Sequence, residues 1–535
     1  MKLILLLFTS FILILNQGIS QLDDVSGFEQ NLVNWHLKNI SSSVMGTNTQ
    51  KTYDEIIGTK PAKKKIIVAV IDAGVDIYHE DLRENIWTNT AEIAGNAIDD
   101  DKNGYIDDVH GWNFLGNAKG ENIDRATLEK TRILRKLAPK YGSGTEYLIN
   151  ENSKREQALY DKLKAEIDKE LKEINDMLPN IKAAKKNIAD GYLYLSQLSG
   201  KPINTVDDLR NLEPANKDEK KLRRQLLIYS KLGLTKKGLA DYEKQLLDQK
   251  EANLNVYFNP RKEIIGDDLN NIADRDYGNP NVIGPDAMHG TFCAGIIGAT
   301  INNGKGINGV ANNVLIMPIR AVPNGDEYDK DVALAIRYAV DNGANIINMS
   351  FGKSYSASKE MVDEAFLYAE SKGVLLVQAA GNSNENIDIE PNFPSDSLNN
   401  GNKVRNHICV GASTISTKKR LPAEFSNYGN RTVDIFAPGL DIISTTKESQ
   451  YENSQGTSFS APLVSGVAAL VWSYYPELTV FQLKELILKS ATPVGRKKVR
   501  IPGGKKKTRF RELCVSDGIV NTYNAFVMAE AMTKK

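Results

Sequence analysis

The chain has 535 residues, 41% of them hydrophobic and 25% charged, a composition that excludes collagen, wholesale disorder and a protein with several membrane spans. Its lysines and arginines equal its aspartates and glutamates, 67 each, so the formal net charge is zero. A nucleic-acid partner, which would need a basic face, is therefore not expected.

The N-terminus has the pattern of a secretory signal. Lys2 precedes an apolar run over residues 3–15, and Gly18 and Ser20 supply small residues for a signal peptidase. The run is short for a bilayer span, although an uncleaved anchor is the alternative. We predict that residues 1–20 are removed, and that the mature protein is secreted or periplasmic and keeps no stable membrane span.

Continuous apolar runs rich in β-branched residues predict strands that are buried on both faces. Helical patterns over residues 331–342 and 359–372 lie between them, with short Gly-rich joints. This alternation predicts an α/β fold with a doubly wound, mainly parallel sheet. The predicted strands are residues 65–72, 314–321, 345–351, 374–380 and 407–411.

The acidic segment 99–107 fits the D-x-D-x-N-G pattern of a calcium loop. Oxygen ligands at alternate positions, with a turn at a glycine, suit a hard cation such as Ca²⁺. A solvated acidic turn is the alternative, and His110 stands where an EF-hand would have glutamate. The candidate metal ligands are Asp99, Asp101, Asn103, the Tyr105 carbonyl and Asp107.

Residues 121–260 differ from the rest of the chain in being rich in lysine and glutamate. A second helical stretch is expected over 218–254, with a joint at 233–235. We predict a helical insertion that packs on itself, and a partner-binding or substrate-gating role stays open. The first predicted helix carries an apolar stripe at Leu159, Leu163, Ile167, Leu171, Ile174 and Leu178.

Three short motifs carry the prediction of catalysis. Asp72 ends the first strand, at the sheet edge where α/β proteins bind ligands. His289 begins a segment rich in glycine and alanine, and Ser458 precedes an apolar helix over 463–472. Each residue alone has a structural explanation, as a helix cap or a packed histidine. Together they offer an acid, a base and a nucleophile.

The order Asp, His, Ser is that of the subtilisin class. The motifs DAG at 72–74, HGT at 289–291 and GTSFSAP at 456–462 resemble the three signatures of the subtilases, peptidase family S8. The resemblance covers residues 65–119 and 264–475. It implies a subtilisin-type sheet and a serine endopeptidase in which these three residues form the triad, with no cofactor for catalysis.

The resemblance also implies further site residues and a domain order. Asn382 would donate its amide to the oxyanion, beside the backbone N–H of Ser458. Two walls would hold an extended substrate peptide: Ser350, Phe351 and Gly352, and Ala379, Ala380 and Gly381. The expected order is a signal peptide (1–20), an N-terminal strap (21–64), a first catalytic part (65–120), the insertion (121–260) and a second catalytic part (261–535).

Some features depart from the family pattern. Ala73 follows the acid where serine or threonine is usual, and Phe292 replaces the usual second histidine. Cys293 resembles the thiol of the proteinase K branch, and all three cysteines are expected to be buried and free. From Asp72 to His289 is 217 residues, 289 minus 72, where subtilases commonly have a few tens.

Three alternatives to a protease would each require a different feature in the sequence. A catalytically silent scaffold should lack a triad or oxyanion residue, and a structural coiled-coil protein would explain only the insertion. An esterase should show a Gly-x-Ser-x-Gly elbow, which Ser458 does not have. We therefore predict a secreted, monomeric serine endopeptidase that acts on proteins or peptides.

Overall fold

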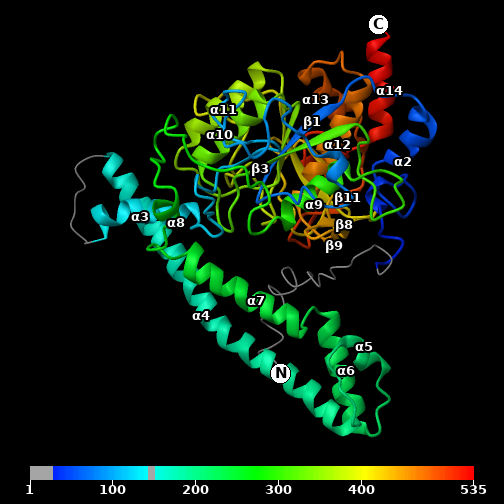
Figure 1. The fold of residues 1–535 in the computed structure, drawn as a ribbon. Helices are drawn as coiled ribbons and strands as arrows, with labels where there is room; N and C mark the ends of the chain where they lie inside the picture. Colours follow the sequence, from blue (N-terminus) through cyan, green and yellow to red (C-terminus); the bar gives the residue numbers. More distant parts are fainter. Residues whose placement is uncertain (1–27, 143–150, 535) are drawn as a thin grey trace. The chain divides into compact units, whose positions relative to one another are not determined.

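The computed structural model describes residues 28–142 and 151–534, so the predicted signal peptide lies outside it. The chain divides into two compact units. The smaller unit is Lys130–Phe258, and the larger one is formed by the chain before and after this segment. Figure 1 shows the smaller unit as a group of helices and the larger one as a sheet flanked by helices.

The larger unit is built on a nine-stranded sheet in the order β10-β13-β7-β6-β5-β4-β1-β3-β2. Its neighbouring strands pair in parallel, apart from β10 and β13. Two antiparallel ribbons, β8–β9 and β11–β12, accompany it. The strands are β1 (Ile66–Asp72), β2 (Trp112–Asn113), β3 (Val314–Arg320), β4 (Ile346–Met349), β5 (Leu375–Ala379), β6 (His407–Ser413), β7 (Ile435–Pro438), β8 (Ile442–Thr446), β9 (Gln450–Ser454), β10 (Thr492–Pro493), β11 (Lys498–Arg500), β12 (Lys507–Arg509) and β13 (Gly518–Ile519).

The predicted subtilisin-type α/β fold is confirmed, and the five predicted strands correspond to β1 and β3–β6. Helices lie before, between and after the strands of the larger unit. They are α2 (Thr49–Thr52), α8 (Pro260–Ile264), α9 (Met288–Gly298), α10 (Asp329–Asp341), α11 (Lys359–Ser371), α12 (Thr457–Tyr474), α13 (Val480–Lys489) and α14 (Thr522–Thr533).

Strand β1 is apolar at every position before Asp72, and its packing shows why. Val68 and Val70 pack in a core that contains residues of α9 and α12. Ala69 and Ile71 pack in a second core, with residues of α10 and α11 (Figure 1). Since successive side chains of a strand point to opposite faces, a sheet covered on both sides requires a continuous apolar run.

The smaller unit is helical, as the sequence indicates. Helix α4 is 49 residues long, and α6 and α7 both pack against it. Of the predicted stripe, Leu163, Ile167, Ile174 and Leu178 are buried, whereas the other two members are half-buried. The helices are α3 (Glu129–Tyr141, which begins at the unit boundary), α4 (Glu151–Ser199), α5 (Val206–Asn211), α6 (Lys217–Lys231) and α7 (Lys236–Asp248).

Residues 28–64 lie along the larger unit and contribute to its core. Trp35 is fully buried, and its indole N–H donates to the Asp441 carbonyl at 2.8 Å. Further along, the Thr522 amide donates to the Thr47 carbonyl at 2.9 Å. These contacts connect the segment to two distant parts of the chain.

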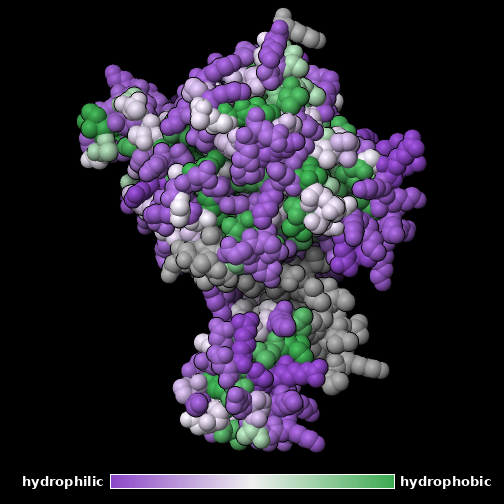
Figure 2. Space-filling view, turned by 90° about the vertical axis from the view of Figure 1, so that its right-hand side faces the viewer, coloured by the Kyte–Doolittle hydropathy of each residue, from purple (hydrophilic) through white to green (hydrophobic). Residues whose placement is uncertain are grey.

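The surface carries mainly polar side chains. On the face shown in Figure 2, hydrophilic residues predominate and hydrophobic ones form separate small patches. Among the helices within residues 28–142 and 151–534, none is both long and apolar enough to cross a membrane.

A buried ionic network fixes the chain where it re-enters the larger unit. Arg261, in α8, forms a two-pronged pair with Asp331 of α10, at 2.6 and 2.8 Å. The Tyr277 hydroxyl donates to the same carboxylate at 2.6 Å, and Arg261 also pairs with Asp267 at 2.7 Å. The Arg261 and Asp331 side chains are 3% and 0% exposed, so each compensates a charge that water cannot solvate.

Replacing Arg261 by methionine should therefore leave Asp331 as an uncompensated buried charge. We expect the free energy of unfolding, measured with urea, to fall by about 3–5 kcal/mol. Lys489→Met, which breaks an exposed pair with Glu485, is the control and should cost at most about 1 kcal/mol. Equal effects of the two variants would contradict this account.

Candidate active site

Asp72 and His289 are brought together by the close approach of α9 to the end of β1. Their contact runs from His289 Nδ1 to Asp72 Oδ1, at 2.8 Å. Gly290 permits it, because a Cβ there would lie 2.1 Å from the Gly74 carbonyl oxygen and 3.0 Å from the Asp72 Cβ. The residue after this histidine must therefore be glycine.

The Asp72 carboxylate is almost fully buried, with its side chain 3% exposed, whereas His289 is 34% exposed. Asp72 Oδ1 also accepts the Ala73 amide at 2.8 Å, and Oδ2 has no hydrogen-bond partner among the described residues. Because an ionised carboxylate only accepts, His289 Nδ1 carries the proton toward it and Nε2 is left as the basic nitrogen.

Ser458 is the second residue of α12, and the neighbouring strand β4 fixes its backbone. The Ser350 hydroxyl donates to the Ser458 carbonyl at 2.8 Å. In return, the Ser458 hydroxyl donates to the Ser350 carbonyl at 3.1 Å. The serine proton therefore points to Ser350 in this structure, and must turn from it to reach a base.

Asn382 is held with its amide N–H group next to the backbone of Ser458. Its Oδ1 accepts the Thr457 amide at 2.8 Å and the Thr457 hydroxyl at 2.9 Å. A Cβ on Gly456 would lie 3.6 Å from both Asn382 Nδ2 and Ser458 N. Two N–H donors thus border one space that glycine leaves open, which is the arrangement an oxyanion requires.

The two predicted substrate walls follow β4 and β5, which are neighbours in the sheet. Asn392 lies between them. A Cβ on Gly352 would lie 3.1 Å from Asn392 Nδ2, and one on Gly381 would lie 3.9 Å from the same atom. Asn392 also donates to the Ala380 carbonyl at 3.3 Å. The glycines of both walls therefore face a common polar side chain that the sequence did not single out.

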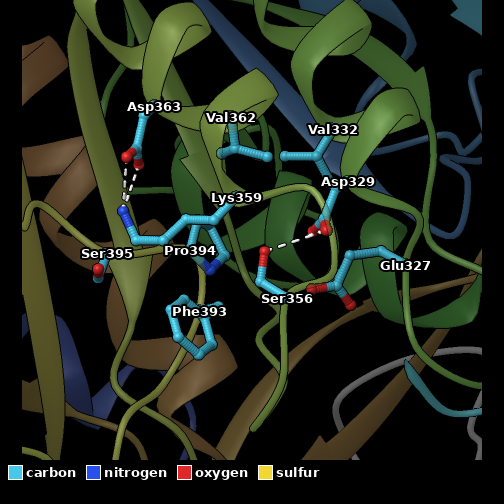
Figure 3. Close-up of a pocket in the computed structure, with 10 residues that line it drawn as sticks. All are labelled: Glu327, Asp329, Val332, Ser356, Lys359, Val362, Asp363, Phe393, Pro394 and Ser395. Atoms are coloured by element: carbon cyan, nitrogen blue, oxygen red, sulfur yellow. Dashed lines mark hydrogen bonds and ion pairs between the residues drawn. The ribbon is translucent and has the colours of Figure 1, made fainter. Parts of the chain in front are cut away.

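A charged cluster next to these walls is structural (Figure 3). Lys359 binds both carboxylate oxygens of Asp363, at 2.5 and 2.7 Å, and Ser356 donates to Asp329 at 3.0 Å. The cavity between them is small, about 10 Å³, and Phe393 and Pro394 line one side. Since its carboxylates already have partners, the cluster fixes the segment that carries Asn392.

A larger pocket of about 260 Å³ opens beside Asp72 and His289. Residues 322–324, which follow β3, form one side, and Ser350 lies at another. Three charged residues that the sequence did not indicate also line it, namely Asp124, Asp286 and Arg320. Asp286 stands three residues before His289, just ahead of α9, and this closeness in sequence is the signal that could have found it.

The cysteines are free and buried, as expected. The Cys293 thiol lies within 4.8 Å of side-chain atoms of Asp72 and His289, and it donates to the Ser458 carbonyl at 3.4 Å. Burial, with the charge of Asp72 nearby, raises the pKa of this thiol well above its usual value. A neutral thiol is a poor nucleophile, so Cys293 packs under the site.

The acidic loop groups some predicted metal ligands and separates others. Carboxylate oxygens of Asp99 and Asp101 lie within 4.8 Å of one another and of Glu92, which the sequence pattern missed. Asp107 instead accepts the amides of residues 95, 96 and 97. Asn103 Oδ1 accepts the Tyr105 amide at 2.8 Å, so these side chains chiefly brace the loop.

Opposing effects act on the pKa of His289. Burial of the ring favours the neutral imidazole. The charge of Asp72, its hydrogen bond and the charge of Asp286 outweigh burial and raise the pKa of His289 above 6.5. For His36 and His407, in contrast, burial outweighs all other contributions and lowers the pKa values to about 3 and about 4.

The comparison with known proteins agrees with this geometry. The subtilase family model matches residues 63–508. A thermophilic serine proteinase of Bacillus sp. (strain AK1) is 41% identical over 186 residues, which cover 35% of this chain and 42% of that protein. Subtilisin DY of Bacillus licheniformis is 34% identical over 211 residues, which cover 39% of this chain and 71% of that protein. The chain therefore spans less than half of the first relative and under three quarters of the second.

Among solved structures, that of a cold adapted subtilisin-like serine proteinase is 31% identical. The match covers 43% of this chain and 74% of that one, with a TM-score of 0.34.

Asp286→Asn should lower the pKa of His289, because it removes a negative charge that stabilises the imidazolium. The measurement is an NMR titration of the histidine ring protons. His36 and His407 titrate far below neutrality and will not overlap. Glu485→Gln, which removes a carboxylate on helix α13, is the matched control and should leave the titration unchanged. An unchanged or raised His289 pKa in Asp286→Asn would contradict the assignment.

Proposed function

The chain belongs to the subtilase family of serine endopeptidases, and we propose that it is a secreted enzyme that hydrolyses peptide bonds through Asp72, His289 and Ser458. The observation that carries the proposal is the 2.8 Å contact between Asp72 and His289. It directs Nδ1 of the base to the acid, which leaves Nε2 as the basic nitrogen. No cofactor is needed for this chemistry.

In the proposed mechanism, Ser458 transfers its proton to His289 Nε2 as its oxygen attacks the peptide carbonyl. Its hydroxyl first leaves the Ser350 carbonyl, which holds it at 3.1 Å. Asp72 stabilises the imidazolium that forms and keeps the ring oriented. His289 then protonates the leaving amine, and water hydrolyses the acyl-enzyme by the reverse proton path.

Asn382 and the Ser458 amide would stabilise the tetrahedral oxyanion. Two observations support these roles: Thr457 fixes the orientation of the asparagine amide, and Gly456 leaves the space between the donors open. One such donor typically contributes about 100- to 1,000-fold in turnover.

An extended peptide would bind along the two walls, Ser350–Gly352 and Ala379–Gly381, by main-chain hydrogen bonds. We propose that the substrates are proteins or peptides and that the mature enzyme is a monomer. The apolar N-terminus supports export, either to the medium or to the periplasm.

The decisive test is hydrolysis of casein by the purified protein and by its Ser458→Ala variant. The wild-type protein should digest casein and react with a fluorophosphonate probe, and the variant should do neither. Ser42→Ala, an exposed serine of the N-terminal segment, is the control and should behave as wild type.

Equal activity or equal labelling of Ser458→Ala would place the chemistry elsewhere. A folded wild-type protein that neither digests casein nor reacts with the probe would instead favour a catalytically silent binding scaffold.

We also propose that the acidic loop binds structural calcium. Glu92, Asp99 and Asp101 offer carboxylate oxygens within 4.8 Å of one another, and hard oxygen ligands of this kind suit Ca²⁺. Three carboxylates so close together repel one another, and a divalent cation would remove that repulsion. Among the predicted ligands, Asn103 and the Tyr105 carbonyl lie in the same loop.

Removal of calcium should lower the melting temperature by several degrees, because a ligand that binds only the folded state stabilises it. The measurement is a thermal melt with excess calcium and with a chelator. The double variant Asp99→Asn, Asp101→Asn should melt at the same temperature in both conditions. A wild-type melting temperature that chelation leaves unchanged would refute the site.

A further inference from the structure

The pocket beside the triad is negatively charged. Its ionisable lining residues, apart from His289, are Asp72, Asp124, Asp286 and Arg320. While His289 is neutral, three aspartates and one arginine leave two net negative charges around a cavity of about 260 Å³. A substrate side chain that enters this pocket therefore meets net negative charge next to His289.

Arg320 does not neutralise the acids by direct contact. It is 2% exposed, and its guanidinium donates to three neutral acceptors, the Ala73 carbonyl, Asn113 Oδ1 and the Ile123 carbonyl. Burial lowers its pKa to about 10, so it stays charged at neutral pH. Three of its N–H groups are thus engaged within the protein, and its charge acts on Asp124 and Asp286 through space rather than by contact.

Asp124 and Asp286 are exposed and make no ion pair with any residue in the described part of the chain. Both have a fixed backbone. Asp124 precedes the pairing of Arg125 with Asn324, and its carbonyl accepts the Asn324 amide at 2.8 Å. Asp286 accepts the Met288 amide at 3.3 Å at the start of α9.

Asp72 adds a third negative charge to the lining of this pocket. Asp72 is 2% exposed, lines the same pocket, and has an oxygen without a hydrogen-bond partner. Its charge is therefore only partly compensated by His289. The pocket thus combines a buried carboxylate at its base with two unpaired carboxylates at its rim.

We propose that this pocket selects substrates with a lysine or arginine beside the scissile bond, and that Asp124 and Asp286 determine this specificity. The inference rests on the proposed function, since the peptide must lie along the triad. A cationic side chain on an extended substrate has an aliphatic stem for the pocket and a charged end for the rim. An acidic side chain would be repelled from the same place.

The test uses fluorogenic peptides that differ at one position. Lysine is compared with norleucine, which has a similar aliphatic stem without the charge, and with glutamate, at each of four positions around the scissile bond. At one position kcat/KM should be about tenfold higher for lysine than for norleucine, as expected from two partly exposed charge pairs. The preference should shrink at high salt.

The double variant Asp124→Asn, Asp286→Asn should reduce the lysine-to-norleucine ratio to near one. Assays are run on the alkaline plateau of the pH profile, so that a changed His289 pKa does not affect the ratio. The matched control Glu485→Gln removes a carboxylate outside the pocket and should keep the wild-type ratio.

A ratio near one in the wild type, or an unchanged ratio in the double variant, would overturn the proposal while hydrolysis still occurs. Failure of the proposed function would look different, because no peptide would be cleaved and the fluorophosphonate probe would not react. Circular dichroism of the double variant verifies that it is folded.

Discussion

The hydrogen bond between Asp72 and His289 joins residues that are 217 positions apart in the chain. It can form only if the strands that precede the helical insertion in the chain and the strands that follow it join one continuous sheet. Strand β1 ends at Asp72 and pairs in parallel with β3, which follows the insertion. Helix α9 then reaches β1 closely enough that a single methyl group at Gly290 would collide with Gly74.

The insertion is compatible with this constraint because both of its ends are fixed in the larger unit. Before it, Glu129 pairs with the buried Lys353 at 2.9 Å. After it, Arg261 pairs with Asp331 at 2.6 Å. The entropy cost of closing a long connection grows slowly with its length, so fixed ends matter more than the number of residues between them. The catalytic sheet can therefore fold around an insertion of this size.

Continuous apolar runs made the sheet predictable, since only a strand covered on both faces needs an apolar residue at every position. The motifs around Asp72, His289 and Ser458 identified candidates because their wording and order are specific. Glu92, Asn392 and Arg320 were not found, since their roles depend on contacts between segments far apart in sequence. The short strands β10 and β13 were also missed, because a strand of two residues is too short to show a hydrophobic period.

Asp286 connects the acid–base chemistry with substrate choice. Its charge raises the pKa of His289, so by itself it stabilises the protonated imidazolium. A cationic side chain bound at the pocket rim would offset that charge and lower the pKa again. The imidazole would then lose its proton more readily when such a substrate is in place, which is when Ser458 needs a base. Selectivity and activation would thus follow from one carboxylate close to one imidazole.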